Sequence, residues 1–468
     1  MEYNAMDNAK LSSVHKKITL LSIGGTFLDG FDISIISVAL IVMSKSQFGT
    51  NTALGSGLIG ASTVIGMLIG AILFGYVTDL YGRKTMYMYD MVLFIIMTIL
   101  EAFSFNFASL FAFRFLLGLG LGADYAIGAT IISEFSPVKY RGKLLATNDL
   151  SWYVGAITAA LTGFLLLPLG SDSWRYMFIV GVIPAVIILI LRKDVPESVR
   201  WLANKGKDEQ AASIELELTG RQDDLKKVRR DNKNPIRDLL SPKYFRSLLF
   251  IGIFWFVFDA AFYGISIFSP TILEFLGFTK QFAVLGSAAF DALAIIGVLL
   301  AIMLIDRIGR KAITIIGFTG MVISLGILGV ITHFYSTKAE FLIVAVPIFI
   351  FFLIFYITEA IGPGTTDFVY PVELFPTEDR ATAQGFGTSV SRIGAILGIT
   401  AFPIIVADVG FSTSLFFFAG LSIIGLLTTI FLGIETKGKS LEEINMIEEQ
   451  EPLEDKEPVS RPIESEEA

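Results

Sequence analysis

The chain has 468 residues, of which 53% are hydrophobic and 17% charged, so its low charge content and mean hydropathy of +0.68 exclude an ordinary soluble domain. The net charge of −8 is local, because residues 441–468 hold eleven acidic and two basic residues, a net of −9, and leave the rest at +1. With no cysteine and only two histidines, the chain excludes disulfides, cysteine nucleophiles and histidine metal clusters, and we expect no metal and no cofactor.

Runs of about 20 apolar residues predict twelve membrane-spanning helices. The first six cover 18–43, 54–78, 86–105, 109–134, 144–168 and 174–192, and the last six cover 246–276, 281–305, 312–334, 339–370, 381–406 and 411–433. We therefore expect an all-α fold with an N-terminal segment 1–17, two six-helix bundles at 18–192 and 246–433, a charged central segment 193–245 and an acidic tail 434–468.

Lysine and arginine alternate in density along the connecting loops. Residues 81–85, 138–143, the central segment and 306–311 are basic, whereas the intervening loops hold few cations. Because basic loops stay in the cytoplasm, this pattern predicts a plasma-membrane protein with both termini cytoplasmic.

Several spans carry ionisable residues. Asp29 and Asp32 share one face of the first span, and Trp255, Asp259 and Tyr263 form a stripe at i, i+4 and i+8 on the seventh. A carboxylate at the bilayer centre costs roughly 2.5–3.5 kcal/mol, so such residues face a protein interior or a water path and indicate a functional site. Further ionisable residues in the spans are Asp90, Arg114, Asp124, Asp149, Glu359, Asp367 and Arg392.

Glycines have two expected roles in the spans. Residues 362–364, Gly-Pro-Gly, should break the tenth span beside a cavity, because they free backbone groups that lipid cannot satisfy. Gly118, Gly120 and Gly122 in the fourth span should instead allow close helix packing.

The two halves repeat the same loop chemistry. Asp79-Leu-Tyr-Gly-Arg-Lys84 recurs as Asp306-Arg-Ile-Gly-Arg-Lys311, and Glu134-Phe-Ser-Pro recurs as Glu373-Leu-Phe-Pro. Such a repeat is typical of a transporter with a midplane site between its halves. We expect a cytoplasmic gate formed by Asp79, Gly82, Arg83, Glu134, Arg141, Asp306, Arg310, Glu373 and Arg380.

The motif Gly75-x-x-x-Asp79-x-x-Gly82-Arg83-Lys84, with its second copy, resembles the signature of the major facilitator superfamily. Residues 196–202 (PESVRWL) and 435–442 (ETKGKSLE) resemble the sugar-porter and related branches. The resemblance implies twelve helices in two pseudo-symmetric halves and secondary transport.

Residues 118–135, the stripe of the seventh span, and the stretches 362–376 and 380–398 resemble the phosphate:proton symporter group of this superfamily. The matching positions imply substrate contact by Tyr125, Trp255, Asp259 and Tyr263. They imply a proton route through Asp29 or Asp32, Asp90 and Asp124, with Arg114 and Arg392 as charge partners, Arg392 replacing a lysine of that group.

The chain also departs from that group. An asparagine of the group is Gly364 here, a threonine is Asp367, and a glutamine falls near Asn148 and Asp149, which we include among the expected substrate contacts. Added carboxylates repel a phosphate unless they are protonated or paired. The first span, LDGFDISIIS, is equally similar to the aromatic-acid:proton symporter group.

These features predict a transporter that couples proton entry to uptake of a small polar or anionic metabolite by alternating access, with inorganic phosphate as the first interpretation. A sugar or an organic or aromatic acid is the alternative substrate, and a non-transporting membrane sensor is a further reading. The chain has no HExxH, GxSxG or P-loop pattern, so we expect no enzyme activity. The expected partners are the substrate, protons and lipid, without nucleic acid, and the expected unit is a monomer.

Overall fold

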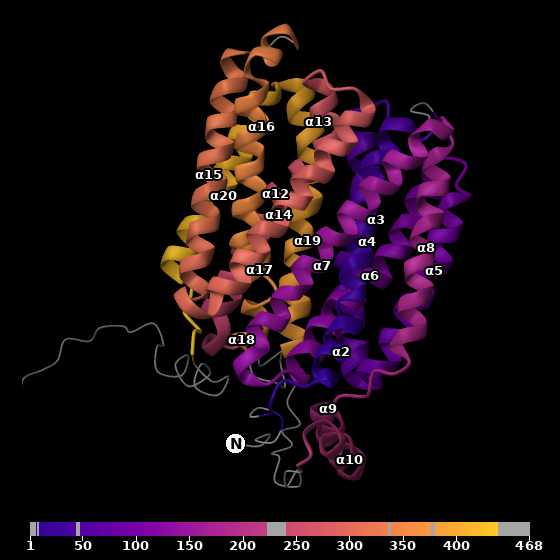
Figure 1. The fold of residues 1–468 in the computed structure, drawn as a ribbon, viewed down its shortest axis with the longest axis vertical. Coiled ribbons are helices and arrows are strands. Elements are labelled where there is room, and N and C mark those ends of the chain that lie inside the picture. Colours follow the sequence, from indigo (N-terminus) through magenta and orange to yellow (C-terminus); the bar gives the residue numbers. More distant parts are fainter. Residues whose placement is uncertain are drawn as a thin grey trace, which may run out of the picture.

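The computed structural model describes residue 6 and residues 9–43, 47–221, 240–335, 338–375 and 380–438. Within these ranges, twelve helical segments are long and apolar enough to cross a membrane, as the sequence predicted. They form one bundle, with the N-terminal helices on one side and the C-terminal helices on the other (Figure 1). The predicted acidic tail lies outside the described residues beyond residue 438.

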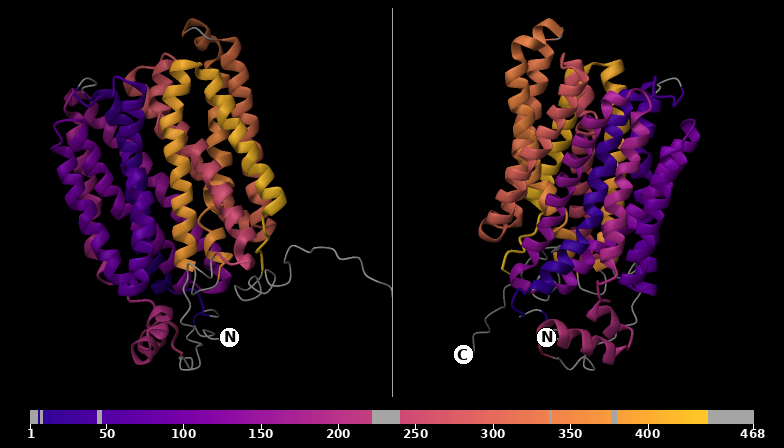
Figure 2. Two further views of the ribbon diagram at one scale, coloured as in Figure 1. Left: turned by 180° about the vertical axis from the view of Figure 1, so that it is seen from behind. Right: turned by 45° about the vertical axis from the view of Figure 1, so that its right-hand side comes forward.

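The N-terminal half contains α2 (Ser13–Ser22), α3 (Gly24–Val42), α4 (Ala53–Tyr81), α5 (Arg83–Ala102), α6 (Phe107–Phe135), α7 (Arg141–Leu166) and α8 (Ser173–Arg192). The C-terminal half contains α12 (Phe245–Ser266), α13 (Ser269–Phe275), α14 (Lys280–Ile308), α15 (Arg310–Phe334), α16 (Lys338–Ile361), α17 (Pro363–Thr366), α18 (Tyr370–Glu373), α19 (Arg380–Asp408) and α20 (Phe411–Leu432). Between the halves, α9 (Val199–Asn204) and α10 (Asp208–Thr219) project from one end of the bundle (Figure 2). We call this end the α9–α10 face; the loop charges predict that it is cytoplasmic.

Corresponding helices of the two halves pack in corresponding pairs. In the N-terminal half α4 packs on α6 and α3 on α7, and in the C-terminal half α14 packs on α16 and α12 on α19. Across the interface, α4 runs along α19 and α7 along α14. The fold is therefore the predicted pair of pseudo-symmetric six-helix halves, which meet along these four helices.

Two spans are interrupted beside the interface. The tenth ends at Ile361 and resumes at Pro363, with Gly362 at φ −107° and ψ −104°, which confirms the predicted break. The span predicted at 246–276 is two helices, because α12 ends at Ser266 and α13 begins at Ser269. Pro270 lies in the first turn of α13, where its missing N–H costs no helical hydrogen bond.

Glycines let the paired helices approach to backbone contact. A Cβ on Gly118 of α6 would lie 2.0 Å from the Thr63 carbonyl oxygen of α4, and one on Gly66 would lie 2.0 Å from that of Phe115. Lipid supplies no hydrophobic force between helices, so association depends on such close packing. This geometry supports the packing role expected for the glycines of the fourth span.

Candidate substrate and proton site

A small polar cavity lies between the two halves. It offers about 20 Å³ to the centre of a water-sized molecule, which is room for about one water. The site is therefore closed around its own side chains. Its lining residues are Tyr125, Asp149, Trp152, Tyr153, Phe258, Asp259, Phe262, Tyr263, Glu359, Gly364, Asp367, Phe368 and Arg392.

Arg392 on α19 is the single cation among the described residues that line this cavity. Its Nη1 lies 3.0 Å from Asp259 Oδ2 on α12, and both side chains are buried. The guanidinium carbon also lies 4.6 Å from the ring centre of Tyr125 and 5.3 Å from that of Tyr263. The carboxylate and the π faces of the two phenol rings thus stabilise the positive charge of the guanidinium.

Asp29 approaches this group from α3. Its Oδ2 accepts hydrogen bonds of 2.9 Å from the Tyr125 hydroxyl and 2.9 Å from Trp152 Nε1. Its Oδ1 is buried and has no hydrogen-bond partner in the described part of the chain. Tyr125 therefore connects an aspartate of the first span to Arg392. Trp152, the second donor to Asp29, lies on the same face of α7 as Asp149.

Three more carboxylates line the cavity. Asp149 accepts a 3.2 Å hydrogen bond from Thr365, and Glu359 accepts one from the Tyr153 hydroxyl. Asp367 Oδ1 and Glu359 Oε2 have no partner among the described residues. Together with Asp259, four carboxylates face one arginine. Burying several negative charges together is costly, so this wall favours protonation of some of them.

Two predicted substrate residues lie outside the cavity wall. The Asn148 Oδ1 accepts a 3.2 Å hydrogen bond from the Thr26 hydroxyl and so joins α7 to α3. Trp255 is 1% exposed and packs against Phe368, with ring centres 6.4 Å apart, at the place where Gly387 leaves room for the indole. The Trp255 indole also hydrogen-bonds Asp259, one turn further along α12, which lines the cavity. Both residues remain predictions as substrate contacts.

Arg192 holds Asp90 and Asp124 in a second network, inside the N-terminal half. Its Nη2 lies 2.8 Å from Asp124 Oδ1, its Nη1 lies 3.2 Å from Asp90 Oδ1, and the guanidinium stacks on the Tyr87 ring at 3.4 Å. The sequence analysis placed Arg192 at the end of the sixth span and gave it no role. In the structure Arg192 is the last residue of α8, and its side chain is 0% exposed.

Arg114 holds Asp32 in a third network. Its Nη2 lies 3.0 Å from Asp32 Oδ2, its Nη1 contacts Glu101, and its Nε donates to the Ser62 hydroxyl at 3.1 Å. The sequence analysis did not include Glu101, although this residue lies three helical turns beyond Asp90 on α5. The carboxylates of the predicted proton route thus fall into three groups, and of these only Asp29 adjoins the central cavity.

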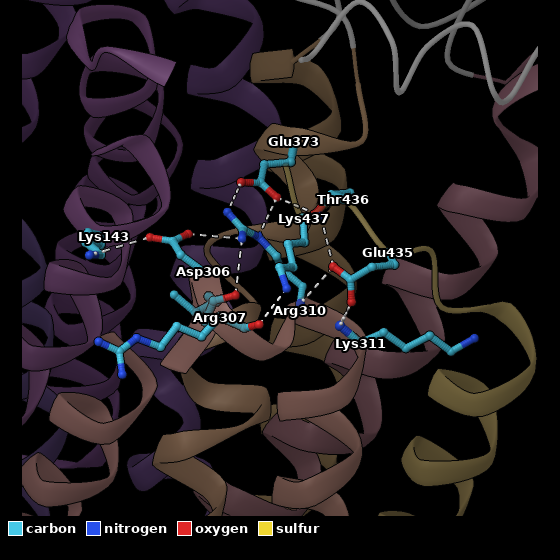
Figure 3. Close-up of polar contacts among 10 residues, drawn as sticks. Lys143, Asp306, Arg307, Arg310, Lys311, Glu373, Glu435, Thr436 and Lys437 are labelled. Atoms are coloured by element: carbon cyan, nitrogen blue, oxygen red, sulfur yellow. Dashed lines mark hydrogen bonds and ion pairs between the residues drawn. The ribbon is translucent and has the colours of Figure 1, made fainter. Parts of the chain in front are cut away.

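The gate residues of the C-terminal half form a network at the α9–α10 face (Figure 3). Arg310 binds both Glu373 oxygens, at 2.8 and 3.0 Å, and Asp306 at 3.1 Å. The Glu435 carboxylate accepts hydrogen bonds from the backbone N–H groups of Arg310 and Lys311, at 3.0 and 3.1 Å. The motif after the last helix therefore caps the exposed N–H groups at the start of α15, where negative charge is favoured.

The N-terminal half repeats this arrangement with Glu197. Its Oε1 accepts the Arg83 N–H at 3.0 Å, and a Cβ on Gly82 would lie 2.5 Å from its Oε2. The Arg83 guanidinium lies 3.4 Å from Glu134. The side chains of Asp79, Arg141 and Arg380 fall outside the described part of the structure, so their gate roles stay predictions.

Contacts between the halves lie at both ends of the bundle. At the α9–α10 face, Lys143 Nζ of α7 lies 3.9 Å from Asp306 Oδ2 of α14, above a cluster of buried apolar side chains from both halves. At the opposite face, Lys280 Nζ donates to the Ile41 carbonyl at 3.2 Å. These contacts join the two halves at both ends of the bundle.

Two pseudo-symmetric halves around a polar cavity, with a charge network repeated at one face, are the architecture of a secondary transporter. Residues 17–447 match the family described as "Sugar (and other) transporter", and the chain belongs to this family of the major facilitator superfamily. This finding confirms the predicted superfamily and its sugar-porter-like character.

Individual relatives cover nearly the whole chain. YaaU of Escherichia coli (strain K12), provisionally named a metabolite transport protein, is 33% identical over 93% of this chain and 95% of its own. A protein of Arabidopsis thaliana, provisionally named inorganic phosphate transporter 1-6, is 28% identical over 97% of each chain. The solved structure of the proton:xylose symporter XylE from E. coli, bound to 6-bromo-6-deoxy-D-glucose, is 24% identical, with a TM-score of 0.78 over 93% of this chain and 99% of XylE. This last likeness shows the fold.

Proposed function

We propose that this protein takes up a small hydroxylated metabolite together with protons, by alternating access of the central cavity. The observation that carries the proposal is the cavity wall, where four carboxylates and one arginine lie among aromatic rings. Carboxylate and phenol oxygens bind hydroxyl groups, and the rings of Phe262 and Phe368 offer flat apolar faces. A neutral sugar-like molecule fits such a wall without adding charge.

Proton coupling follows from the same charges. Asp149, Asp259, Glu359 and Asp367 line the same cavity as Arg392, the one cation among its described lining residues, so the cavity is most stable when protons neutralise part of the excess negative charge. Protons would load from the outer side, the halves would close, and opening toward the α9–α10 face would release protons and substrate. The gate contacts Lys143–Asp306 and Lys280–Ile41 would then break in turn.

Inorganic phosphate is the second candidate, and one observation favours it. Arg392 is paired with Asp259 at 3.0 Å, so protonation of Asp259 would leave the guanidinium available to an anion. The Arabidopsis relative named for phosphate transport agrees with this candidate. We place it second because the anion would still face Asp149, Glu359 and Asp367. An organic acid would bind by the same chemistry.

Uptake into proteoliposomes tests the proposal. The purified full chain is given an inward proton gradient and labelled hexose, phosphate, a short hydroxy acid or a hydroxylated benzoate. We expect hexose accumulation that a protonophore abolishes. Phosphate or acid accumulation alone would instead select the second candidate. Tight binding of one of these compounds without any uptake would contradict transport and favour a membrane sensor.

A further inference from the structure

A second cavity lies on the side of the central site that faces away from α9 and α10. It offers about 10 Å³ to the centre of a water-sized molecule, close to the space of one water or one small cation. Asp291 of α14 lines it together with serines from α3, α12 and α14 and with Ser269 at the start of α13. Trp152 lines both cavities, so this outer cavity and the central one are neighbours.

Asp291 is a buried carboxylate without a compensating cation. It is 8% exposed, and no hydrogen bond or ion pair joins its carboxylate to the described residues. On the same helix, Lys280 lies three turns away and donates to the Ile41 carbonyl. An uncompensated ionised carboxylate at membrane depth is costly, so Asp291 requires either a proton or a bound cation.

The hydroxyl groups around Asp291 can bind a proton carrier such as water, or a small cation, beside the carboxylate. Ser37 and Ser287 donate to the carbonyls of Ser34 and Val284, at 2.6 and 2.8 Å, which leaves their oxygen lone pairs available. The Ser266 hydroxyl is buried and has no hydrogen-bond partner within the described ranges. The cavity therefore combines one carboxylate with several uncharged oxygens, one of them unpaired.

The charged and titratable groups that face Asp291 add no positive charge. Glu359 and Tyr356 of α16 and Tyr153 of α7 interact with it electrostatically. The elements α3 and α13 present serines to the cavity. The interaction with Glu359, which also lines the central cavity, links the two cavities electrostatically.

We propose that Asp291 is an outer proton-binding site, loaded through the serine-lined cavity before the central site closes. It lines a different cavity from the carboxylates around Arg392, and Trp152 is common to the two cavities. The inference rests on the proposed proton coupling and adds a site to it. A sodium ion bound by the same oxygens is the rival occupant, and the experiment distinguishes the two.

Two transport measurements on Asp291→Asn test the inference. Asparagine keeps the shape of a protonated aspartate but cannot release a proton. Coupling to one proton under a gradient of about one pH unit accumulates the substrate about tenfold inside the vesicles. We expect the variant to lose this accumulation. Exchange of labelled for unlabelled substrate should continue. Retained exchange shows that the variant is folded. Asp408→Asn, an exposed carboxylate at the outer end of α19, is the matched control and should change neither measurement.

Accumulation by Asp291→Asn equal to that of the natural chain would overturn the inference. Uptake driven by a sodium gradient at equal pH, lost in the variant, would overturn it in favour of sodium. A measurement without substrate separates this inference from the proposed function. Dicyclohexylcarbodiimide modifies protonated buried carboxyl groups, so peptide mass spectrometry should find Asp291 labelled at acidic pH. Absence of the label would overturn the inference whether or not a substrate is found.

Discussion

Arg392 on α19 and Asp259 on α12 form a buried ion pair with an Nη1–Oδ2 distance of 3.0 Å. The pair joins two helices of the C-terminal half, and the guanidinium also contacts the rings of Tyr125 in the N-terminal half and Tyr263 in its own. One side chain therefore links the predicted substrate residues of both halves.

Replacing Arg392 by methionine should destabilise the protein by about 3–5 kcal/mol, because the change leaves Asp259 buried without a cation. The double variant Arg392→Met, Asp259→Asn should regain part of this stability, yet neither should transport substrate. Thermal unfolding in detergent and proteoliposome uptake check the two effects. A double variant no more stable than the single one would contradict the assignment of the loss to the unpaired carboxylate.

The Arg192 network should behave as a structural unit of the N-terminal half. Arg192→Met leaves Asp90 and Asp124 buried together, so we expect a loss of about 3–5 kcal/mol, partly restored by adding Asp124→Asn. Lys17→Met is the control, because the Lys17–Asp194 pair is 57% and 61% exposed and should contribute less than about 1 kcal/mol. Equal unfolding midpoints for Arg192→Met and Lys17→Met would refute this expectation.

Replacing Gly309 should destabilise the protein for two reasons, its backbone conformation and the lack of space for a side chain. Gly410, which has only the first of these features, separates the two effects. Its φ is 97°, and a Cβ there would lie 2.3 Å from Glu435 Oε2. Gly410 has φ 106° but no atom within 4 Å of a Cβ. Gly410→Ala should therefore cost about 1–2 kcal/mol of backbone strain, and Gly309→Ala more, because Glu435 loses its place at the start of α15. Comparison of their unfolding midpoints checks the difference.

Glu197 should make stability depend on pH. Burial raises the pKa of its carboxyl group above the ordinary value of 4.5, against the opposing effect of backbone N–H groups. The folded state then holds the proton to a higher pH than the unfolded chain does. Its contribution to stability is complete below the unfolded pKa and is lost as pH rises through the folded pKa.

The natural chain should therefore lose stability relative to Glu197→Gln as pH rises from about 4 to about 8. Unfolding midpoints of the two proteins across this range measure the change. Glu209→Gln, on the exposed side of α10, controls for removal of a carboxylate. A natural chain that instead gains stability relative to Glu197→Gln as pH rises would show that the pKa moves in the opposite direction.

Crosslinking at the α9–α10 face should stop transport. The chain has no cysteine, so Lys143→Cys with Asp306→Cys introduces one unique pair, at side chains whose charged atoms lie 3.9 Å apart. Joining them with a short bis-maleimide should abolish uptake, because the halves must separate at this face. Each single-cysteine variant treated in the same way should keep its uptake. Unchanged uptake after complete crosslinking would contradict alternating access at this face.

Local sequence patterns were sufficient for much of the architecture. Apolar length predicted the twelve spans, Gly362 and Pro363 predicted the break of the tenth, and the repeated loop motifs predicted two equivalent halves. These features depend on the membrane thickness and on backbone chemistry, which act within one segment. The stripe of Asp259 and Tyr263 is likewise local, because helical spacing places both on the cavity side of α12.

The tertiary structure alone decided which charges meet. Arg192 follows Asp124 by 68 residues and Asp90 by 102, and nothing in their spacing separates this cluster from Asp29 or from the Arg114–Asp32 pair. Trp152 and Asp291 line the same outer cavity because α7 and α14 pack together. The electrostatic energy of a buried charge depends on the few ångströms to its neighbours, and helix packing between distant segments sets those distances.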